Sequence, residues 1–221
     1  MEAIGPILAV GAVLALIVGI VLLNLRIERK RTEALAAACQ AMGYTFEEKG
    51  DVESLRTFGD LPVFDHGHSK TARNVMTGTV ADHPVKLFDY RYTTGSGKNS
   101  HTYRQTVALF PGGAQGLPDF ALAPENFFHK IGGFFGYQDI DFEASPDFSS
   151  HYLLRGSDEM AIRTAFSADA LSFFAQQRGW NVEVRSAHAG IYRSGKQCKP
   201  EEAPAYLAEA LRVLLALHPA A

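Results

Sequence analysis

Residues 84–110 read PVKLFDYRYTTGSGKNSHTYRQTVALF, and they give the clearest indication of the fold class. In the first part, Val85 and Leu87 lie on one face of an extended chain, and three aromatic residues lie on the other: Phe88, Tyr90 and Tyr92. Residues 101–110 alternate in the same way. Residues 93–100 hold two glycines and make a flexible connection. The stretch is therefore typical of two antiparallel strands.

A third strand-like run, 73–80, precedes this pair and joins it through a tight connection at 81–83. Three consecutive strands with such connections form an antiparallel meander. Two shorter runs come earlier, and we expect a short strand at 44–46 and an edge strand at 61–64. The sequence therefore predicts an α+β domain whose first part, residues 44–112, is a β-meander.

Residues 113–221 predict a helix–strand–helix–hairpin–helix region. Residues 111–118 hold three glycines and two prolines and form a linker between the two parts. The elements expected after it are a helix opened by Pro124 and Glu125 and stopped at Gly132, a strand at 152–155, helices capped within 157–159 and at Ser167, a hairpin of 180–185 and 190–193, and an amphipathic helix over 201–217.

Residues 4–25 read IGPILAVGAVLALIVGIVLLNL, a run of 22 residues without a charge. A helix of this length rises about 1.5 Å per residue and covers the roughly 30 Å of a hydrocarbon layer. No basic residue precedes it, which is unlike a cleaved signal peptide. The sequence predicts that residues 1–25 form a transmembrane anchor that contacts the lipid bilayer from Ile4 to Leu25.

Four basic residues follow this run directly: Arg26, Arg29, Lys30 and Arg31. The positive-inside rule places such residues in the cytoplasm. We therefore expect a single-pass protein of the bacterial inner (plasma) membrane, with its N-terminus outside and its C-terminal domain in the cytoplasm. Residues 26–43 are expected to continue the helix as a juxtamembrane stalk until Gly43 ends it.

The composition excludes some function classes. The formal net charge is −3, so no basic excess indicates binding to nucleic acid. Cys39 and Cys198 are the two cysteines, and no C-x-x-C spacing joins them. In a reducing compartment we expect both to be buried free thiols. No cofactor is predicted.

Asp139 and Asp141 alternate with apolar residues, and Glu143 continues the pattern. On an extended chain these carboxylates share one face. A carboxylate pair could serve acid–base chemistry or bind Ca²⁺, although the glycine and terminal glutamate of a calcium loop are missing from the sequence. The more common explanation is a half-buried strand with one solvated face.

His66 and His68 are two residues apart and follow Asp65, so they could point the same way and bind a divalent metal. No firm third ligand lies nearby in the sequence, and His83 or His101 would have to be brought in by folding. We therefore predict a polar loop here and no metal site.

Phe134 and Phe135 belong to an aromatic segment around Gly132, together with Phe127, Phe128 and Tyr137. Such a segment is expected in the core, but it could be a docking surface if the glycine-rich turn leaves it exposed.

Several short motifs resemble an uncharacterised family of bacterial single-pass inner-membrane proteins. The residues that carry this resemblance are 117–122 (LPDFAL), 124–126 (PEN), 136–142 (GYQDIDF), 148–149 (FS), 152–156 (YLLRG) and 162–163 (IR). The resemblance covers most of residues 44–217. It implies a cytoplasmic α+β domain and brings no known activity, substrate or catalytic residue.

We weigh two functions. The favoured one is a membrane-anchored, non-catalytic module that binds an unidentified protein or a second copy of itself. The alternative is a membrane-tethered enzyme or small-ligand receptor in which Asp139 and Asp141 converge with histidines, and such convergence needs contacts of about 3 Å. A third, weaker possibility is contact between lipid headgroups and the basic residues 26–31.

Overall fold

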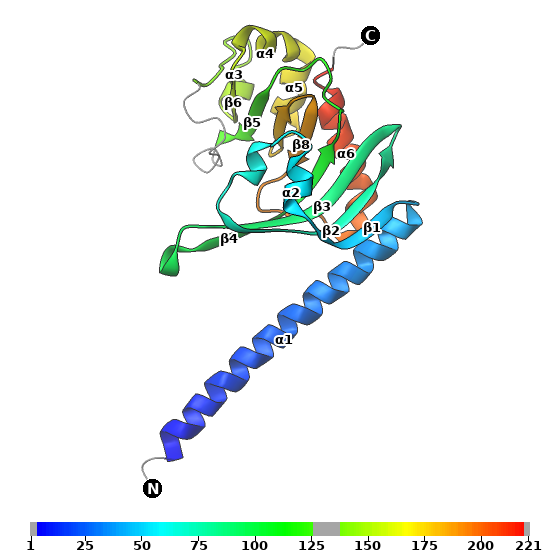
Figure 1. Ribbon diagram of the computed structural model, residues 1–221. Helices are drawn as coiled ribbons and strands as arrows, with labels where there is room; N and C mark the ends of the chain where they lie inside the picture. Colours follow the sequence, from blue (N-terminus) through cyan, green and yellow to red (C-terminus); the bar gives the residue numbers. More distant parts are fainter. Residues whose placement is uncertain (1–3, 126–137, 219–221) are drawn as a thin grey trace.

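The computed structural model describes residues 4–125 and 138–218, without the side chains of residues 4–10 and 12. The described chain forms one antiparallel sheet of eight strands, in the order β1-β2-β3-β4-β8-β7-β5-β6, with helices packed against it (Figure 1). A long N-terminal helix, α1, runs from Ile4 to Ala41 and projects away from the sheet. The predicted α+β fold class is confirmed.

The elements have the following bounds. The strands are β1 (Thr45–Gly50), β2 (His68–Val80), β3 (His83–Thr94), β4 (His101–Phe110), β5 (Phe120–Pro124), β6 (Tyr152–Gly156), β7 (Asn181–Arg185) and β8 (His188–Tyr192). The α-helices after α1 are α2 (Val52–Arg56), α3 (Pro146–Ser149), α4 (Glu159–Ala165), α5 (Ala168–Gln176) and α6 (Ala203–Leu215). The 3₁₀ helices whose bounds lie within the described residues are η1 (Pro62–Phe64), η2 (Gly97–Asn99) and η4 (Pro200–Glu202).

The meander of β2, β3 and β4 is present as the sequence predicts. Its first turn consists of Ala81 and Asp82, both with positive φ (42° and 67°), as a two-residue hairpin turn requires. The β3–β4 hairpin pairs Tyr92 with Tyr103 and reaches Phe88 opposite Val107. Strand β2 begins at His68, five residues earlier than expected, β3 extends from His83 to Thr94, and β4 has the predicted bounds.

The two predicted parts of the domain contribute strands to the same sheet. Strand β4 pairs with β8, with Val107 opposite Tyr192, so the linker 111–118 connects strands of one sheet. Strand β5 was not predicted, because its five residues are almost all buried and show no alternation. Pro124, expected to open a helix, is the last residue of β5, and residues 126–132 of the expected helix lie outside the described residues.

Two of the predicted strands are wrong. Residues 61–64 contain the 3₁₀ helix η1 in place of an edge strand: backbone hydrogen bonds run from Phe64 N to Leu61 O and from Asp65 N to Pro62 O (both 2.9 Å), and Leu61, Val63 and Phe64 are all buried. Residues 139–143 form no strand, although their burial does alternate around the buried Ile140. A backbone hydrogen bond from Ile140 N to Leu154 O (2.8 Å) fixes this segment beside β6.

The sheet has apolar residues on both faces. Helices α3 to α6 and the end of α1 cover one face, where the core includes Leu35, Leu122, Phe174 and Leu214. The segment of α2 and η1 covers the middle of the other face, where the core includes Phe64, Tyr90 and Tyr192. The caps expected at Asp158 and Ser167 are present, since their side chains accept hydrogen bonds from Ala161 N and Ala170 N.

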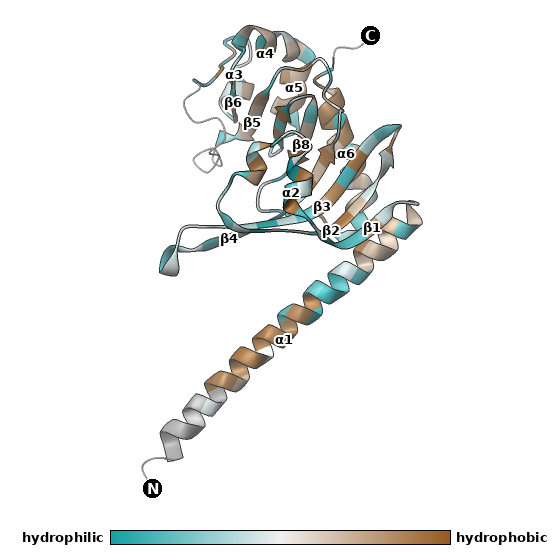
Figure 2. Cartoon of the chain, in the orientation of Figure 1, coloured by the Kyte–Doolittle hydropathy of each residue, from teal (hydrophilic) through white to brown (hydrophobic). Residues whose placement is uncertain are grey.

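Helix α1 is one continuous helix, as predicted, and Gly43 with φ of 71° follows its end. Its last turns pack on the sheet through Leu35 and Cys39, which are buried. Its earlier part carries large apolar side chains that are 50 to 64% exposed: Val13, Leu14, Leu16, Ile17, Val18, Ile20, Val21, Leu22, Leu23, Leu25 and Ile27. Figure 2 shows this part as a brown band along the helix.

Within the residues that the structure describes, no helix is long and apolar enough to cross a membrane. The transmembrane, single-pass span expected over residues 4–25 is therefore not supported.

Candidate functional site

A buried ion pair joins α1 to the sheet. Arg31 on α1 donates from Nε to Asp89 Oδ2 (2.8 Å) and from Nη2 to Asp89 Oδ1 (2.7 Å). Asp89 on β3 also accepts hydrogen bonds from Asn74 Nδ2 (2.9 Å) and Thr106 Oγ1 (3.0 Å). The third donor of Arg31, Nη1, reaches the carbonyl oxygen of Cys198 (2.9 Å). Such a two-pronged, fully bonded pair holds the helix in one orientation on the sheet.

A groove opens where α1 leaves the sheet, on the N-terminal side of Arg31. Its volume is about 980 Å³. One wall is α1, with Val21 and Leu25; the other is formed by strands β1 to β4, with Arg91 and Arg104 among its residues. The groove therefore lies next to the end of the exposed apolar part of α1.

The sheet wall of this groove is basic. Arg91 on β3 is directly opposite Arg104 on β4. Both face α1, because each is two residues from a side chain that bonds in the Arg31–Asp89 network, namely Asp89 on β3 and Thr106 on β4. Like charges directly opposite each other destabilise a sheet.

Few of the basic residues in the groove have an acidic partner. Five basic side chains line it, namely Lys49, Lys70, Arg73, Arg91 and Arg104, against three acidic ones, namely Glu28, Asp51 and Asp89. Asp89 is already paired with Arg31, and Arg73 pairs with Glu48 (2.8 Å). Among the residues described, the other four basic side chains form no salt bridge. The groove thus combines an apolar helix with unpaired positive charge.

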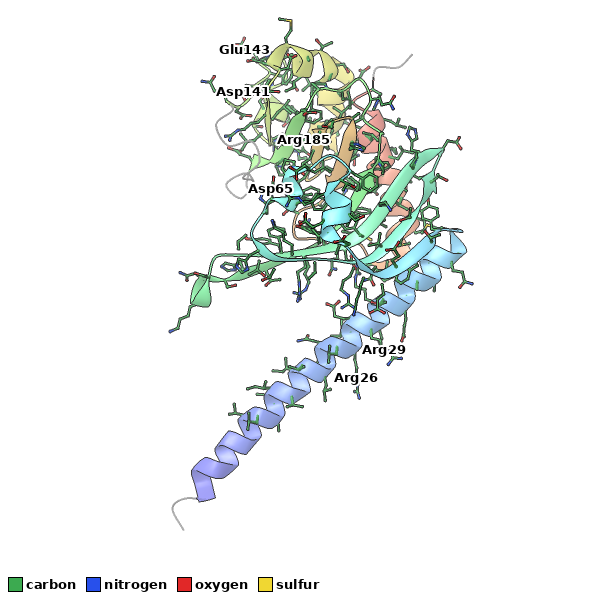
Figure 3. The ribbon with its side chains drawn as sticks, viewed as in Figure 1. Arg26, Arg29, Asp65, Asp141, Glu143 and Arg185 are labelled. Atoms are coloured by element: carbon green, nitrogen blue, oxygen red, sulfur yellow. The ribbon has the colours of Figure 1, made fainter. Side chains whose placement is uncertain are left out.

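The predicted carboxylates lie elsewhere. Asp139 Oδ1 accepts a hydrogen bond from Leu154 N (2.9 Å), and burial raises the pKa of Asp139 above its usual value. Asp141 is exposed, and its carbonyl oxygen accepts from Arg163 Nη1 (2.8 Å). Figure 3 shows Asp141 and Glu143 near the end of the domain that is far from α1. The hydrogen bond to Leu154 gives Asp139 a structural role beside β6.

The predicted histidines occupy two different environments. His66 is buried beside the ring of Tyr92 (5.8 Å between ring centroids), and this burial lowers its pKa to about 4. His68 is exposed at the start of β2, and its ring lies 3.0 Å from the carbonyl oxygen of Gly95. Figure 3 shows Asp65, which precedes His66, well separated from Asp141. The contacts of these residues do not bring the carboxylates and histidines into one site.

No group of three or more His, Cys, Asp or Glu residues is arranged to hold a metal ion within residues 4–125 and 138–218. Phe134 and Phe135, the aromatic interaction candidates, lie outside the described residues. Of the four basic residues after the apolar run, Arg26, Arg29 and Lys30 are exposed on α1, and Arg29 pairs with Glu33 (2.8 Å). Only Arg31 turns toward the domain.

A second polar centre was missed by the sequence interpretation. Glu183 on β7 is fully buried, accepts from Tyr192 Oη (2.7 Å) and from Val63 N (2.8 Å), and has a pKa raised to about 7 by burial. The hydroxyls of Tyr90 and Tyr92 in the same core have no hydrogen-bond partner among the described residues. Glu183 stands between two valines, and this pattern normally places a polar residue on the solvent face of a strand.

The basic row of the groove was also missed, although the sequence holds a signal for it. The predicted strands 84–92 and 101–110 flank one turn, and pairing Tyr92 with Tyr103 places Arg91 opposite Arg104. The groove also depends on where α1 crosses the sheet, and no local sequence pattern determines that path.

No protein-family model and no curated protein sequence matches this chain. A solved structure is similar to it: the crystal structure of the mycobacterial trehalose monomycolate transport factor A, TtfA. The TM-score is 0.60 at 13% sequence identity, and the match covers 87% of this chain and 98% of that chain. At this identity the similarity shows a shared fold.

Proposed function

We propose that this chain is a non-catalytic accessory protein held at the bacterial inner membrane by the apolar part of α1. The observation that carries the proposal is the exposed apolar band of α1, from Val13 to Ile27. Soluble monomers rarely expose continuous apolar patches of more than a few hundred Å². Acyl chains are the environment that such a band fits on all sides of a helix.

The orientation follows from the charges at the end of this band. Arg26 and Arg29 lie at the end of the apolar band of α1 (Figure 3), and both they and Lys30 are exposed. Basic residues at this position favour the cytoplasmic side of the membrane. We therefore propose that the sheet domain lies in the cytoplasm, close to the bilayer surface, with the N-terminus of α1 toward the other side.

The accessory role has two supports. The ion pair of Arg31 with Asp89 fixes the domain on α1, which suits a module that must present one surface at a set distance from the bilayer. The structure with the shared fold is described as a transport factor. We extend to this chain only the general idea of an accessory that works with other membrane components, whether a different protein or a second copy.

Cross-linking in intact cells tests this function. The full chain is cross-linked in its own membrane, and whatever is attached is identified by mass spectrometry. The proposal expects the chain in the membrane fraction after a carbonate wash, with one dominant partner or a self-link. A Leu22→Glu, Val18→Glu variant should move to the soluble fraction. Met160→Glu is the matched control, because Met160 is 81% exposed but lies on α4.

Two results would count against the proposal. A wild-type chain that leaves the membrane with the wash would exclude anchoring by α1. Turnover of a small metabolite by the purified full chain, lost in an Asp139→Asn variant, would replace the accessory role by the enzyme alternative.

A further inference from the structure

We propose that the groove between α1 and the sheet binds the phosphate headgroup of an anionic membrane phospholipid. The inference deepens the proposed function and rests on it, because the membrane must hold the groove at the lipid surface. The proposed function concerns the attachment of α1 to the membrane, and the groove adds a binding site for one class of lipid.

The sheet wall of the groove is positively charged. Arg91 and Arg104 are directly opposite each other and face the same cavity, an arrangement that costs stability while it is unpaired. Two other basic residues nearby are paired, Arg31 with Asp89 and Arg73 with Glu48, whereas Lys49 and Lys70 add further positive charge to the groove. A phosphate group between the two arginines would offset their repulsion, and planar guanidinium groups bind phosphate through paired hydrogen bonds.

The opposite wall of the groove, formed by α1, carries apolar side chains. Val21 and Leu25 line the same cavity from α1 and are exposed. A free phosphate or a nucleotide would occupy the basic wall and leave these side chains in water. A phospholipid places its phosphate against the arginines and the start of its acyl chains against α1, so it matches both walls.

The position and size of the groove also suit a lipid headgroup. Residues 21–28 of α1 form the helix wall of the groove, and they span the change from apolar to charged side chains. In the proposed membrane attachment this change coincides with the headgroup layer. Figure 1 shows the β3–β4 hairpin extending on the same side of the domain as the projecting part of α1. The volume of about 980 Å³ suits a headgroup with its glycerol, with the acyl chains remaining in the bilayer.

Native mass spectrometry of the full chain in nanodiscs provides the test. The discs contain equal amounts of phosphatidylglycerol and phosphatidylcholine, and the lipid that stays bound after release is counted. The wild-type chain should retain phosphatidylglycerol over phosphatidylcholine by at least about fivefold. An Arg91→Gln, Arg104→Gln variant should retain both lipids about equally.

The matched control removes the same charge at the same bilayer. An Arg26→Gln, Arg29→Gln variant changes two arginines of α1 that do not line the groove. It should keep most of the phosphatidylglycerol preference. If it loses the preference as fully as the groove variant, the effect is general attraction to an anionic surface and the inference is wrong. Circular dichroism checks folding, and Arg104→Gln alone replaces the double variant if that one unfolds.

A second arm separates the lipid from free phosphate. The chain in pure phosphatidylcholine discs is titrated with inorganic phosphate, and thermal unfolding is followed. Phosphate alone should give no shift, whereas phosphatidylglycerol in the disc should raise the unfolding temperature. An equal shift from phosphate would overturn the lipid assignment. If the chain leaves the discs altogether, the proposed function has failed; if it stays without preferring phosphatidylglycerol, only this inference has failed.

Discussion

Arg31 on α1 and Asp89 on β3 form a two-pronged ion pair, with oxygen–nitrogen distances of 2.8 and 2.7 Å. Both side chains are largely buried, at 15% and 8% exposure. Their pairing sets the direction in which α1 leaves the sheet, and this direction creates the groove beside Val21 and Leu25. A helix attached only by apolar contacts could slide or rotate on the sheet. The ion pair prevents this movement and so fixes the shape of the groove.

Breaking this pair should destabilise the chain. Asp89→Asn leaves the Arg31 guanidinium buried without a counter-charge, and we expect a loss of about 3 to 5 kcal/mol in the free energy of unfolding. Urea unfolding of the full chain in mild detergent measures it. The double variant Arg31→Met, Asp89→Asn should lose clearly less than the two single changes added together. Simple additivity of the two single effects would show that the pair does not act as a unit.

The packing of α1 can be tested apart from its charge. Leu35→Ala creates a cavity under the docked end of α1 and should cost about 2 to 5 kcal/mol. Ile27→Ala is the matched control, because Ile27 lies on the same helix but is exposed, and it should change unfolding by no more than about 0.5 kcal/mol. Equal effects of the two changes in the same urea titration would mean that the end of α1 is not docked.

Glu183 should make stability depend on pH. Its folded pKa of about 7 lies above the ordinary 4.5, so the folded chain keeps a proton that the unfolded chain releases between these values. Stability contributed by this proton is present below pH 4.5 and is lost as pH rises through 7. Glu183→Gln should therefore be more stable than wild type by up to about 3 kcal/mol at pH 8 and equal to it near pH 4.

His66 gives the opposite dependence of folding stability on pH, over nearly the same pH range. Its folded pKa of about 4 lies below the ordinary 6.5, so stability is full above pH 6.5 and is lost as pH falls toward 4. The two groups offset each other in wild type, and the Glu183→Gln variant should show a steeper loss of stability from pH 7 to 4. Glu201→Gln, at an exposed position, is the control. A constant difference between Glu183→Gln and wild type at all pH values would contradict this explanation.

The two thiols should be unreactive in the folded chain. Cys39 and Cys198 are buried and free, and burial raises the pKa of both. Little of either thiol is therefore in the reactive thiolate form at neutral pH. Iodoacetamide at pH 7.5 should leave both unmodified under native conditions and alkylate both in urea, as read by mass spectrometry. Rapid native alkylation of Cys198 would mean that the bonds around Arg31 open easily.

The parts of the fold that depend on local pattern could be predicted. Alternation identified the two strands of the β3–β4 hairpin, strand-like runs next to turns identified β2 and the β7–β8 hairpin, and capping residues such as Asp158 and Ser167 identified two helices. Strand β5 could not be predicted, because it is buried on both faces and its residues show no period. Segment 61–64 failed for the same reason: a fully buried apolar run has no periodicity that separates a strand from a 3₁₀ helix.

The candidate site was harder to predict because its parts are far apart in the chain. Candidate residues that lie within a few positions of one another, such as the carboxylates at 139–143 and the histidines at 66 and 68, are visible in the sequence. The groove instead brings together α1 and four strands, β1 to β4, and its charge depends on the cross-strand partnership of Arg91 and Arg104. Glu183 was missed because its pattern is that of an ordinary exposed strand residue.

The central claim is that the apolar part of α1 lies in lipid while its end is docked on the domain. Leu22→Cys and, as control, Glu33→Cys are labelled with an environment-sensitive NBD fluorophore, and the full chain is reconstituted in vesicles with brominated acyl chains. The account predicts strong quenching at position 22 and little at position 33. Equal, weak quenching at both positions would contradict it.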